Sequence, residues 1–282
     1  MNKQKQGYIK WLVLSVFIIC FGIATFYDLA ISKAIANENN IFGKWMENTT
    51  VVPFAYTLLL SGCIALGTCK KEKSVKGIAI LVLCLIYYIL GVGLSGLFIW
   101  NYLGVWILAL HAVGICALTV FAFKIKDKDK KNWQKVALVC GLTFLLSVIA
   151  VEVLKLIWGR VRPRALEGRD ELFTRWYSIN GKEFLAQVTA KEEIKSFPSG
   201  HSQWGAAAFS LSTIPLASKK LQNKNFLFWC ICLGWGVLVM LGRVLVGAHF
   251  PTDAMAGFGI AFMIFMIVRR VVFGKVSHSE NF

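Results

Sequence analysis

Charged residues are scarce in this chain, and acidic residues are scarcer than basic ones. Only 16% of the 282 residues are charged, and 15 Asp and Glu stand against 31 Lys and Arg. With 57% hydrophobic residues and a mean hydropathy of +0.62, the composition excludes an ordinary soluble domain. Internal repeats, low-complexity tracts and polar stretches of domain length are also missing. The sequence therefore predicts an integral membrane protein.

The loops expected on the outer side lack cysteine and clustered metal ligands. All eight cysteines fall in or at the ends of apolar runs, so no disulfide framework is predicted. The clustered carboxylates of the outer loops, Asp170-Glu171 and Glu192-Glu193, have no histidine beside them. We therefore predict neither a metal site nor a cofactor.

Apolar runs that could cross a hydrocarbon core of about 30 Å occur eight times along the chain. The fold class predicted is all-α: a polytopic transmembrane helical bundle of about eight spans. The third and fourth spans are expected to meet in a tight turn at Asn101–Tyr102. His111, inside the fourth span, is interpreted as the partner in an interhelical hydrogen bond. The expected spans are Trp11–Tyr27, Val51–Cys69, Gly77–Trp100, Leu103–Phe123, Val136–Trp158, Gln203–Ala217, Phe226–Val246 and Ala254–Val268.

Basic residues are concentrated on one side of this predicted topology. With a cytoplasmic N-terminus, the inner segments hold 19 Lys and Arg against 4 Asp and Glu, and the rest of the chain holds 12 against 11. The positive-inside rule then predicts a multi-pass cell-membrane protein with both termini in the cytoplasm. Because topology explains the basic excess, no nucleic-acid partner is predicted. The inner segments are Met1–Lys10, Lys70–Lys76, Lys124–Lys135, Lys219–Asn225 and Arg269–Phe282.

The first apolar run has two interpretations. Lysines precede it and Ala34-Ile35-Ala36 follows it, as in a signal peptide with a small-residue cleavage site. However, the run is long for a signal peptide, and Tyr27, Asp28 and Lys33 stand before that site. We therefore favour an uncleaved membrane anchor.

Ser196–Ser202 is a polar stretch whose side chains could take part in a reaction. It reads Ser-Phe-Pro-Ser-Gly-His-Ser and lies just before an apolar run. Ser199 and Gly200 are expected at the start of a helix, where unpaired backbone N–H groups favour an oxyanion. His201 adds an imidazole at the same place. Taken alone, the stretch would equally suit an ordinary turn with a capping serine.

A second polar stretch lies upstream, where Lys155–Pro163 reads Lys-Leu-Ile-Trp-Gly-Arg-Val-Arg-Pro at the end of the fifth span. If the helix continues, Lys155 and Arg162 share one face, two turns apart. Glu152 is one turn before Lys155 and is expected to pair with it. Arg160 is interpreted either as an interfacial anchor or as a functional residue.

A third polar stretch, Gly242–Asp253, follows the seventh span and contains Arg243, His249 and Asp253. Because the fifth and seventh spans run outwards and the sixth runs inwards, all three stretches are expected at the outer face. Together they supply cations, hydroxyl and backbone donors, two imidazoles and a carboxylate. Phosphoryl transfer requires this set of groups.

The order and spacing of the three stretches resemble the signature of the type 2 phosphatidic acid phosphatase superfamily of membrane lipid phosphatases. The resemblance covers Lys155 to Asp253, about a third of the chain. One position departs from it, because the family usually has serine where this chain has Gly242. A lost hydrogen bond is worth roughly 0.5–3 kcal/mol, so we expect weaker phosphate binding rather than an inactive enzyme. The alternative interpretation is that this glycine lets the backbone approach more closely.

The resemblance implies roles for the residues in these stretches. His249 is expected to be the nucleophile that forms a phosphohistidine, and Asp253 is expected to hold its other ring nitrogen. His201 is expected to protonate the departing alcohol and then activate water. The residues expected to bind the phosphate are Lys155, Arg162, Ser199, Gly200 and Arg243.

The function implied is a metal-independent integral membrane phosphatase that hydrolyses lipid phosphate monoesters or diphosphates at the outer face. Candidate substrates are phosphatidic acid, phosphatidylglycerol phosphate and undecaprenyl diphosphate, and the partners are this lipid and the bilayer. Residues 1–135 are expected to form four N-terminal spans with inner basic loops, and residues 136–282 the phosphatase core. No oligomeric state is predicted.

Two alternatives remain open at this stage. If an alcohol replaces water as the acceptor, the protein is a lipid-linked phosphotransferase. An anionic-lipid transporter would use the same cations but would place them near the bilayer midplane. Here the charges lie at span ends and two histidines join them, which favours an enzyme.

Overall fold

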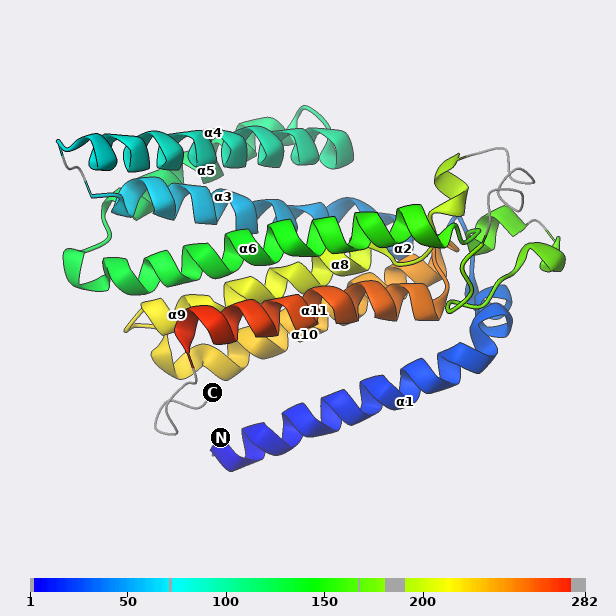
Figure 1. Ribbon diagram of the computed structural model, residues 1–282. Helices are drawn as coiled ribbons and strands as arrows, with labels where there is room; N and C mark the ends of the chain where they lie inside the picture. Colours follow the sequence, from blue (N-terminus) through cyan, green and yellow to red (C-terminus); the bar gives the residue numbers. More distant parts are fainter. Residues whose placement is uncertain (1–2, 71–72, 167, 181–190, 275–282) are drawn as a thin grey trace.

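The computed structural model describes residues 3–70, 73–166, 168–180 and 191–274, and the secondary structure in these ranges is entirely helical. The expected all-α polytopic bundle is confirmed. Most helices lie side by side, whereas α1 diverges from them (Figure 1). The elements are α1 (Lys3–Ile35), α2 (Ile41–Thr49), α3 (Val51–Thr68), α4 (Val75–Leu103), α5 (Ile107–Phe123), α6 (Asp127–Trp158), η1 (Pro163–Leu166), η2 (Asp170–Leu172), η3 (Lys191–Ile194), α8 (Gly200–Ala207), η4 (Ala208–Thr213), α9 (Ile214–Ala217), η5 (Gln222–Lys224), α10 (Asn225–Leu245) and α11 (Pro251–Phe273).

Within the described ranges, six helical segments are long and apolar enough to cross a membrane, which makes this a multi-pass membrane protein. Two expected spans correspond to shorter elements: the fourth is α5, and the sixth is built from α8, η4 and α9 in succession. The turn between α4 and α5 lies at residues 104–106, later than the expected Asn101–Tyr102. Gly104 sets this position, because its φ of 82° ends the helix.

Aromatic stacking joins the N-terminal and C-terminal helices. Phe54 on α3 stacks on Phe144 of α6 at 4.5 Å between ring centroids and on Trp204 of α8 at 5.1 Å. The three rings belong to one buried cluster. The first spans therefore share a core with the helices that carry the polar stretches.

Short polar side chains connect neighbouring helices inside the bundle. Ser61 donates to the carbonyl of Ala137, 2.5 Å away, and the amide of Gln203 donates to the Ser147 hydroxyl at 2.7 Å. The expected interhelical bond of His111 is confirmed, because its Nε2 lies 3.1 Å from the Ser95 hydroxyl. Such bonds hold helices together where water cannot compete. All eight cysteines are free thiols.

Helix α1 contacts the bundle over only part of its length (Figure 1). Between α1, α10 and α11 lies a mostly apolar cavity of about 570 Å³. The C-terminal part of α1 docks on the loops through Asp28, which is 2% exposed.

The end of α6, the start of α8 and the turn between α10 and α11 lie at the same end of the bundle (Figure 1). Backbone hydrogen bonds join them, since Ser196 N donates to Arg160 O and Ser199 N donates to Asp253 O, each at 3.0 Å. Parts of the expected loops lie outside the described residues: 167 and 181–190 of the outer loop Ala165–Lys195, and 1–2, 71–72 and 275–282 of the inner segments.

Candidate active site

Helix α6 contains Lys155 but ends before Arg162, so the two cations do not lie on one helix as expected. The helix ends at Trp158, because Gly159 takes the left-handed conformation with φ 60°. Arg162 therefore lies in the following loop, where its backbone N–H donates to Glu193 O at 2.8 Å. The expectation that Lys155 and Arg162 share a helix face is wrong.

Lys155 nevertheless reaches the second polar stretch. Its Nζ donates to Glu152 at 2.7 Å, so the expected pair within α6 is confirmed. A Cβ atom placed on Gly200 would lie 2.8 Å from the same Nζ. The ammonium group therefore lies directly over the first residue of α8.

Ser199 caps helix α8. Its hydroxyl oxygen accepts from Ser202 N at 3.3 Å and from the Ser202 hydroxyl at 3.0 Å, so the capping interpretation is confirmed. Because both bonds use the oxygen as acceptor, the hydroxyl proton of Ser199 remains available to a ligand. The first N–H groups of α8, starting at Gly200, lack intrahelical partners and face the same region.

His201 is held by aromatic rings. Its ring centroid lies 4.5 Å from that of Trp204 on α8 and 5.5 Å from that of Tyr102 on α4. Within the described part of the chain, its buried Nε2 has no hydrogen-bond partner. Tyr102 belongs to the N-terminal spans, so these spans contribute a side chain to the candidate site.

Arg243 lies near the end of α10 with 1% of its side chain exposed, and its Nη1 is 2.9 Å from a carboxylate oxygen of Glu47 on α2. The preceding residue, Gly242, packs against the same helix. A Cβ atom at position 242 would lie 2.6 Å from Cβ of Met46. The departure from the family pattern thus has a steric reason, because α2 occupies the space that a serine side chain would need.

His249 occupies the turn between α10 and α11 and is 2% exposed. Its Nδ1 lies 2.6 Å from the backbone carbonyl of Ser196. A carbonyl oxygen only accepts, so in the neutral ring Nδ1 carries the proton and Nε2 keeps a lone pair. This is the tautomer that a nucleophilic imidazole requires.

Asp253 does not hold His249, and the expectation of a direct contact is wrong. One carboxylate oxygen accepts from the Ser196 hydroxyl at 2.5 Å and from Phe250 N at 3.0 Å. Asp253 is the third residue of α11, where an acidic side chain turns back to cap the helix start. Asp253 therefore contacts His249 only indirectly. It holds Ser196, and the carbonyl of Ser196 contacts the His249 ring.

Arg160 is fully buried, so the interpretation as an interfacial anchor is wrong. Its Nη1 donates to Asp253 at 2.5 Å, its Nη2 donates to Asp28 at 2.8 Å, and its Nε donates to Thr174 O at 2.8 Å. The guanidinium also lies 4.2 Å from the ring centroid of Phe250. This network ties α1, the loop after α6 and the start of α11 together.

One member of this network could have been found from the sequence. Asp28 directly follows the first apolar run and is the sole carboxylate of α1, and an ionisable residue at such a place marks a buried partner or a functional site. Ser196 and Glu47 gave no comparable signal, because each acts through a neighbour that is distant in the sequence.

The electrostatic environment favours neutral His249. Burial lowers the pKa of its imidazole well below the usual value, and the charges of Arg162, Arg243 and Lys155 lower it further. At neutral pH the ring is therefore uncharged and its Nε2 lone pair is free to attack an electrophile.

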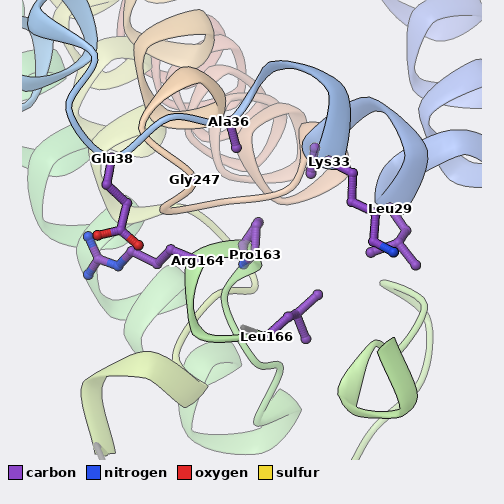
Figure 2. A pocket seen from close by; sticks show the side chains of 9 residues that line it. Leu29, Lys33, Ala36, Glu38, Pro163, Arg164, Leu166 and Gly247 are labelled. Carbon is purple, nitrogen blue, oxygen red and sulfur yellow. The ribbon is translucent and has the colours of Figure 1, made fainter. Parts of the chain in front are cut away.

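A separate cavity of about 180 Å³ lies beside this cluster. Figure 2 shows its lining side chains, which come from the end of α1, the loop around η1 and the turn after α10, with the guanidinium of Arg164 directed toward Glu38. Arg164 also pairs with Glu193 at 2.6 Å. The cavity contains no imidazole, so the groups suited to phosphate chemistry lie outside it.

The cluster can accept an oxyanion. Arg162 Nε, His201 Nε2 and Arg243 Nε are buried and have no hydrogen-bond partner within the described residues. Lys155, Arg162 and Arg243 all lie close enough to His201 to act on it electrostatically. Unpaired buried donors are costly, and a tetrahedral anion with several acceptor oxygens would satisfy them together. Among the described residues, no three His, Cys, Asp or Glu side chains gather as metal ligands.

Parts of the chain are similar in sequence to known phosphatases and phosphatase-related proteins. Two relatives are phosphatidylglycerophosphatase B of Haemophilus influenzae, 25% identical over 56% of this chain and 74% of the relative, and of Bacillus subtilis, 35% identical over 40% and 57%. A PA-phosphatase related-family protein of Dictyostelium discoideum is 24% identical over 62% of this chain and 63% of its own length. The chain thus spans less than two thirds of the last two relatives. No solved structure matches significantly. The model of the PAP2 superfamily matches residues 136–277, half of the chain, and the protein therefore belongs to the PAP2 superfamily.

Proposed function

We propose that this protein is a membrane lipid phosphatase that hydrolyses phosphate monoesters or diphosphates of lipids through a phosphohistidine at His249. The observation that carries the proposal is that Arg162 Nε, His201 Nε2 and Arg243 Nε are buried and have no hydrogen-bond partner in the described part of the chain. Phosphatidylglycerol phosphate is a substrate candidate because two relatives are named phosphatidylglycerophosphatase B. Phosphatidic acid and undecaprenyl diphosphate are the other candidates.

The phosphate would lie among Lys155, Arg162 and Arg243, with the Ser199 hydroxyl and the Gly200 N–H as further donors. Arginine forks suit the equatorial oxygens, and the ammonium supplies a point charge. These groups stabilise the charge that spreads over the oxygens in the transition state.

In the first step, Nε2 of His249 attacks phosphorus, the bond to the lipid oxygen breaks, and His201 donates a proton to that oxygen. In the second step, water attacks phosphorus, His201 takes a proton from it, and the bond to His249 breaks as phosphate leaves. Asp253 contributes by holding Ser196, whose carbonyl fixes the His249 tautomer. The three cations neutralise the phosphate in this scheme, so we propose that the reaction needs no metal ion.

A direct test is phosphate release in detergent with EDTA present, measured on each of the three candidate lipids. We expect His249→Ala and His201→Ala to lower the rate at least about 1,000-fold, because each removes a group that takes part in bond making or proton transfer. His111→Ala is the matched control, since His111 bonds to Ser95 between α4 and α5, and it should retain activity.

The outcomes separate the alternatives. Loss of wild-type activity in EDTA would overturn the metal-independent mechanism. Transfer of phosphate to an added alcohol without release into water would identify a phosphotransferase. Binding of lipid phosphate with neither reaction would favour an anionic-lipid transporter.

We further propose that the site faces the extracytoplasmic side and that both termini are cytoplasmic, as the distribution of basic residues indicates. A cysteine at exposed Val105, between α4 and α5, should then react with a membrane-impermeant maleimide in intact cells. A cysteine at exposed Lys128 should react only after the membrane is opened. The opposite labelling pattern would reverse the topology.

The division of labour between the two halves is also a proposal. Residues 136–282 would form the phosphatase core, and residues 1–135 would add four spans. Tyr102 beside His201 and Glu47 beside Arg243 suggest that these spans do more than cover the core.

A further inference from the structure

Glu47 is a carboxylate at the centre of a site that should bind an anion. Its Oε2 lies 2.9 Å from Nη1 of Arg243, whose side chain is 1% exposed, whereas the Glu47 side chain is 30% exposed. Nε of Arg243 has no hydrogen-bond partner within the described residues. The guanidinium is therefore buried in the ion pair, whereas the Glu47 carboxylate keeps access to solvent.

The backbone that carries Glu47 is closely packed against α10. Helix α2 packs so closely on α10 that a Cβ atom on Gly43 would lie 2.3 Å from Val246 and 2.9 Å from Gly242 O. Asn40 caps the start of α2 by accepting from Gly43 N at 2.8 Å. We therefore expect a change in the Glu47–Arg243 contact to come from the Glu47 side chain, which is 30% exposed.

Carboxylates already neutralise part of the positive charge near the two imidazoles. Lys155 is paired with Glu152, and Arg243 is paired with Glu47, so two carboxylates offset two of the three cations near the imidazoles. A phosphate that uses Nε and Nη1 of Arg243 would lie next to the Glu47 carboxylate. Like charges at this distance repel strongly where water is largely excluded.

We propose that Glu47 is the anion that a phosphate group must displace from Arg243, and that it thereby sets the affinity of the site for phosphate. The inference rests on the proposed phosphate site. In the empty site, Glu47 compensates the buried guanidinium. In the occupied site, its side chain turns toward solvent, and its return to Arg243 favours release of inorganic phosphate after the second step.

This role makes a prediction opposite to that of a carboxylate that only orients Arg243. An orienting residue strengthens phosphate binding, so its removal weakens binding. A competing anion weakens phosphate binding, so its removal strengthens binding. The sign of the change in the dissociation constant therefore decides between them.

The experiment is calorimetric titration of inorganic phosphate into the full-length protein in detergent. We expect Glu47→Gln to lower the dissociation constant about tenfold, because a repulsive charge is lost while the shape of the side chain is kept. Glu38→Gln is the matched control, because it changes net charge equally on a carboxylate near Arg164 rather than Arg243, and it should leave the constant unchanged. Arg243→Gln should abolish binding.

Thermal unfolding provides a second measurement that does not depend on activity. Without phosphate, Glu47→Gln should melt below wild type, because Arg243 loses its counter-charge in a buried position. Saturating phosphate should raise the Tm of Glu47→Gln by more than that of wild type.

The outcomes separate this inference from the proposed function. If wild type binds phosphate and hydrolyses lipid phosphates but Glu47→Gln binds phosphate equally or more weakly, the inference alone is overturned. If Glu47→Gln binds phosphate more tightly but wild type hydrolyses no lipid phosphate, the proposed function fails and the anion site stands. If phosphate binds none of the proteins, the inference is overturned, and the hydrolysis of lipid phosphates alone decides the proposed function.

Discussion

Replacing Arg160 with methionine should lower the free energy of unfolding by about 3–5 kcal/mol, because it leaves two buried carboxylates without their shared cation. Asp28 and Asp253 are 2% and 0% exposed, and both bond to this guanidinium. The substitution should also reduce phosphate release, since Asp253 would no longer be held against Ser196. The measurement is unfolding by denaturant in mixed micelles, followed by tryptophan fluorescence.

The matched control is Arg164→Met, four residues further along the same stretch. Arg164 also forms an ion pair, with Glu193, but its side chain is 28% exposed. Pairs with access to water contribute about 0–1 kcal/mol, so this variant should remain close to wild type. Equal destabilisation by the two substitutions would contradict the central role of Arg160.

The second large effect is expected from Gly257→Ala, which should reduce phosphate release about 100-fold by shifting the site by about 1 Å. A Cβ atom at this position would lie 2.1 Å from Ser199 O and 3.0 Å from Ser199 C. These are backbone atoms, so no side-chain rotation can relieve the clash. Either α11 or the loop before α8 must move, and Ser199, Gly200 and His201 move with it.

Gly259→Ala is the control on the same helix. The nearest atom to a Cβ there is Cζ of Phe17 at 3.7 Å, which is an ordinary contact. Alanine also favours the helix over glycine, so this variant should be active and at least as stable as wild type. Full activity in Gly257→Ala would mean that α11 does not fix the position of the α8 loop.

The contrast between the two glycines shows how the site is built. Each polar stretch is anchored by backbone contacts with another: Ser199 N donates to Asp253 O, and Ser196 N donates to Arg160 O. The imidazole of His249 is in turn held by Ser196 O. A change in one stretch is therefore transmitted to the others through main-chain atoms, which are less adaptable than side chains.

Much of the site could be predicted from the sequence, because its signals are local. Apolar runs identified the helices, and the polar stretches at their ends identified Lys155, Arg162, His201, Arg243 and His249. The structure brings these residues together, because the other four all act electrostatically on His249. The pairing of Glu152 with Lys155 and the cap at Ser199 also follow from spacing alone, and both are confirmed.

The partners of these residues could not be predicted in the same way. Spacing suggested that Asp253 would reach His249, but the capping position of Asp253 directs its carboxylate to Phe250 N and Ser196. Spacing also suggested a helix through Arg162, but Gly159 ends α6 earlier. In each case the local sequence was compatible with two arrangements, and the sequence spacing alone did not identify the one that forms.

By itself, the sequence determined that this is an all-α membrane protein with three polar stretches suited to an oxyanion, because hydropathy and motif spacing are properties of the chain. Only the tertiary structure decided that Asp28 compensates Arg160 across 132 residues, that Ser196 orients His249, and that Glu47 lies on Arg243. The physical reason is that a buried charge or an imidazole tautomer depends on whatever group packing brings within about 3 Å, and no local pattern encodes that neighbour.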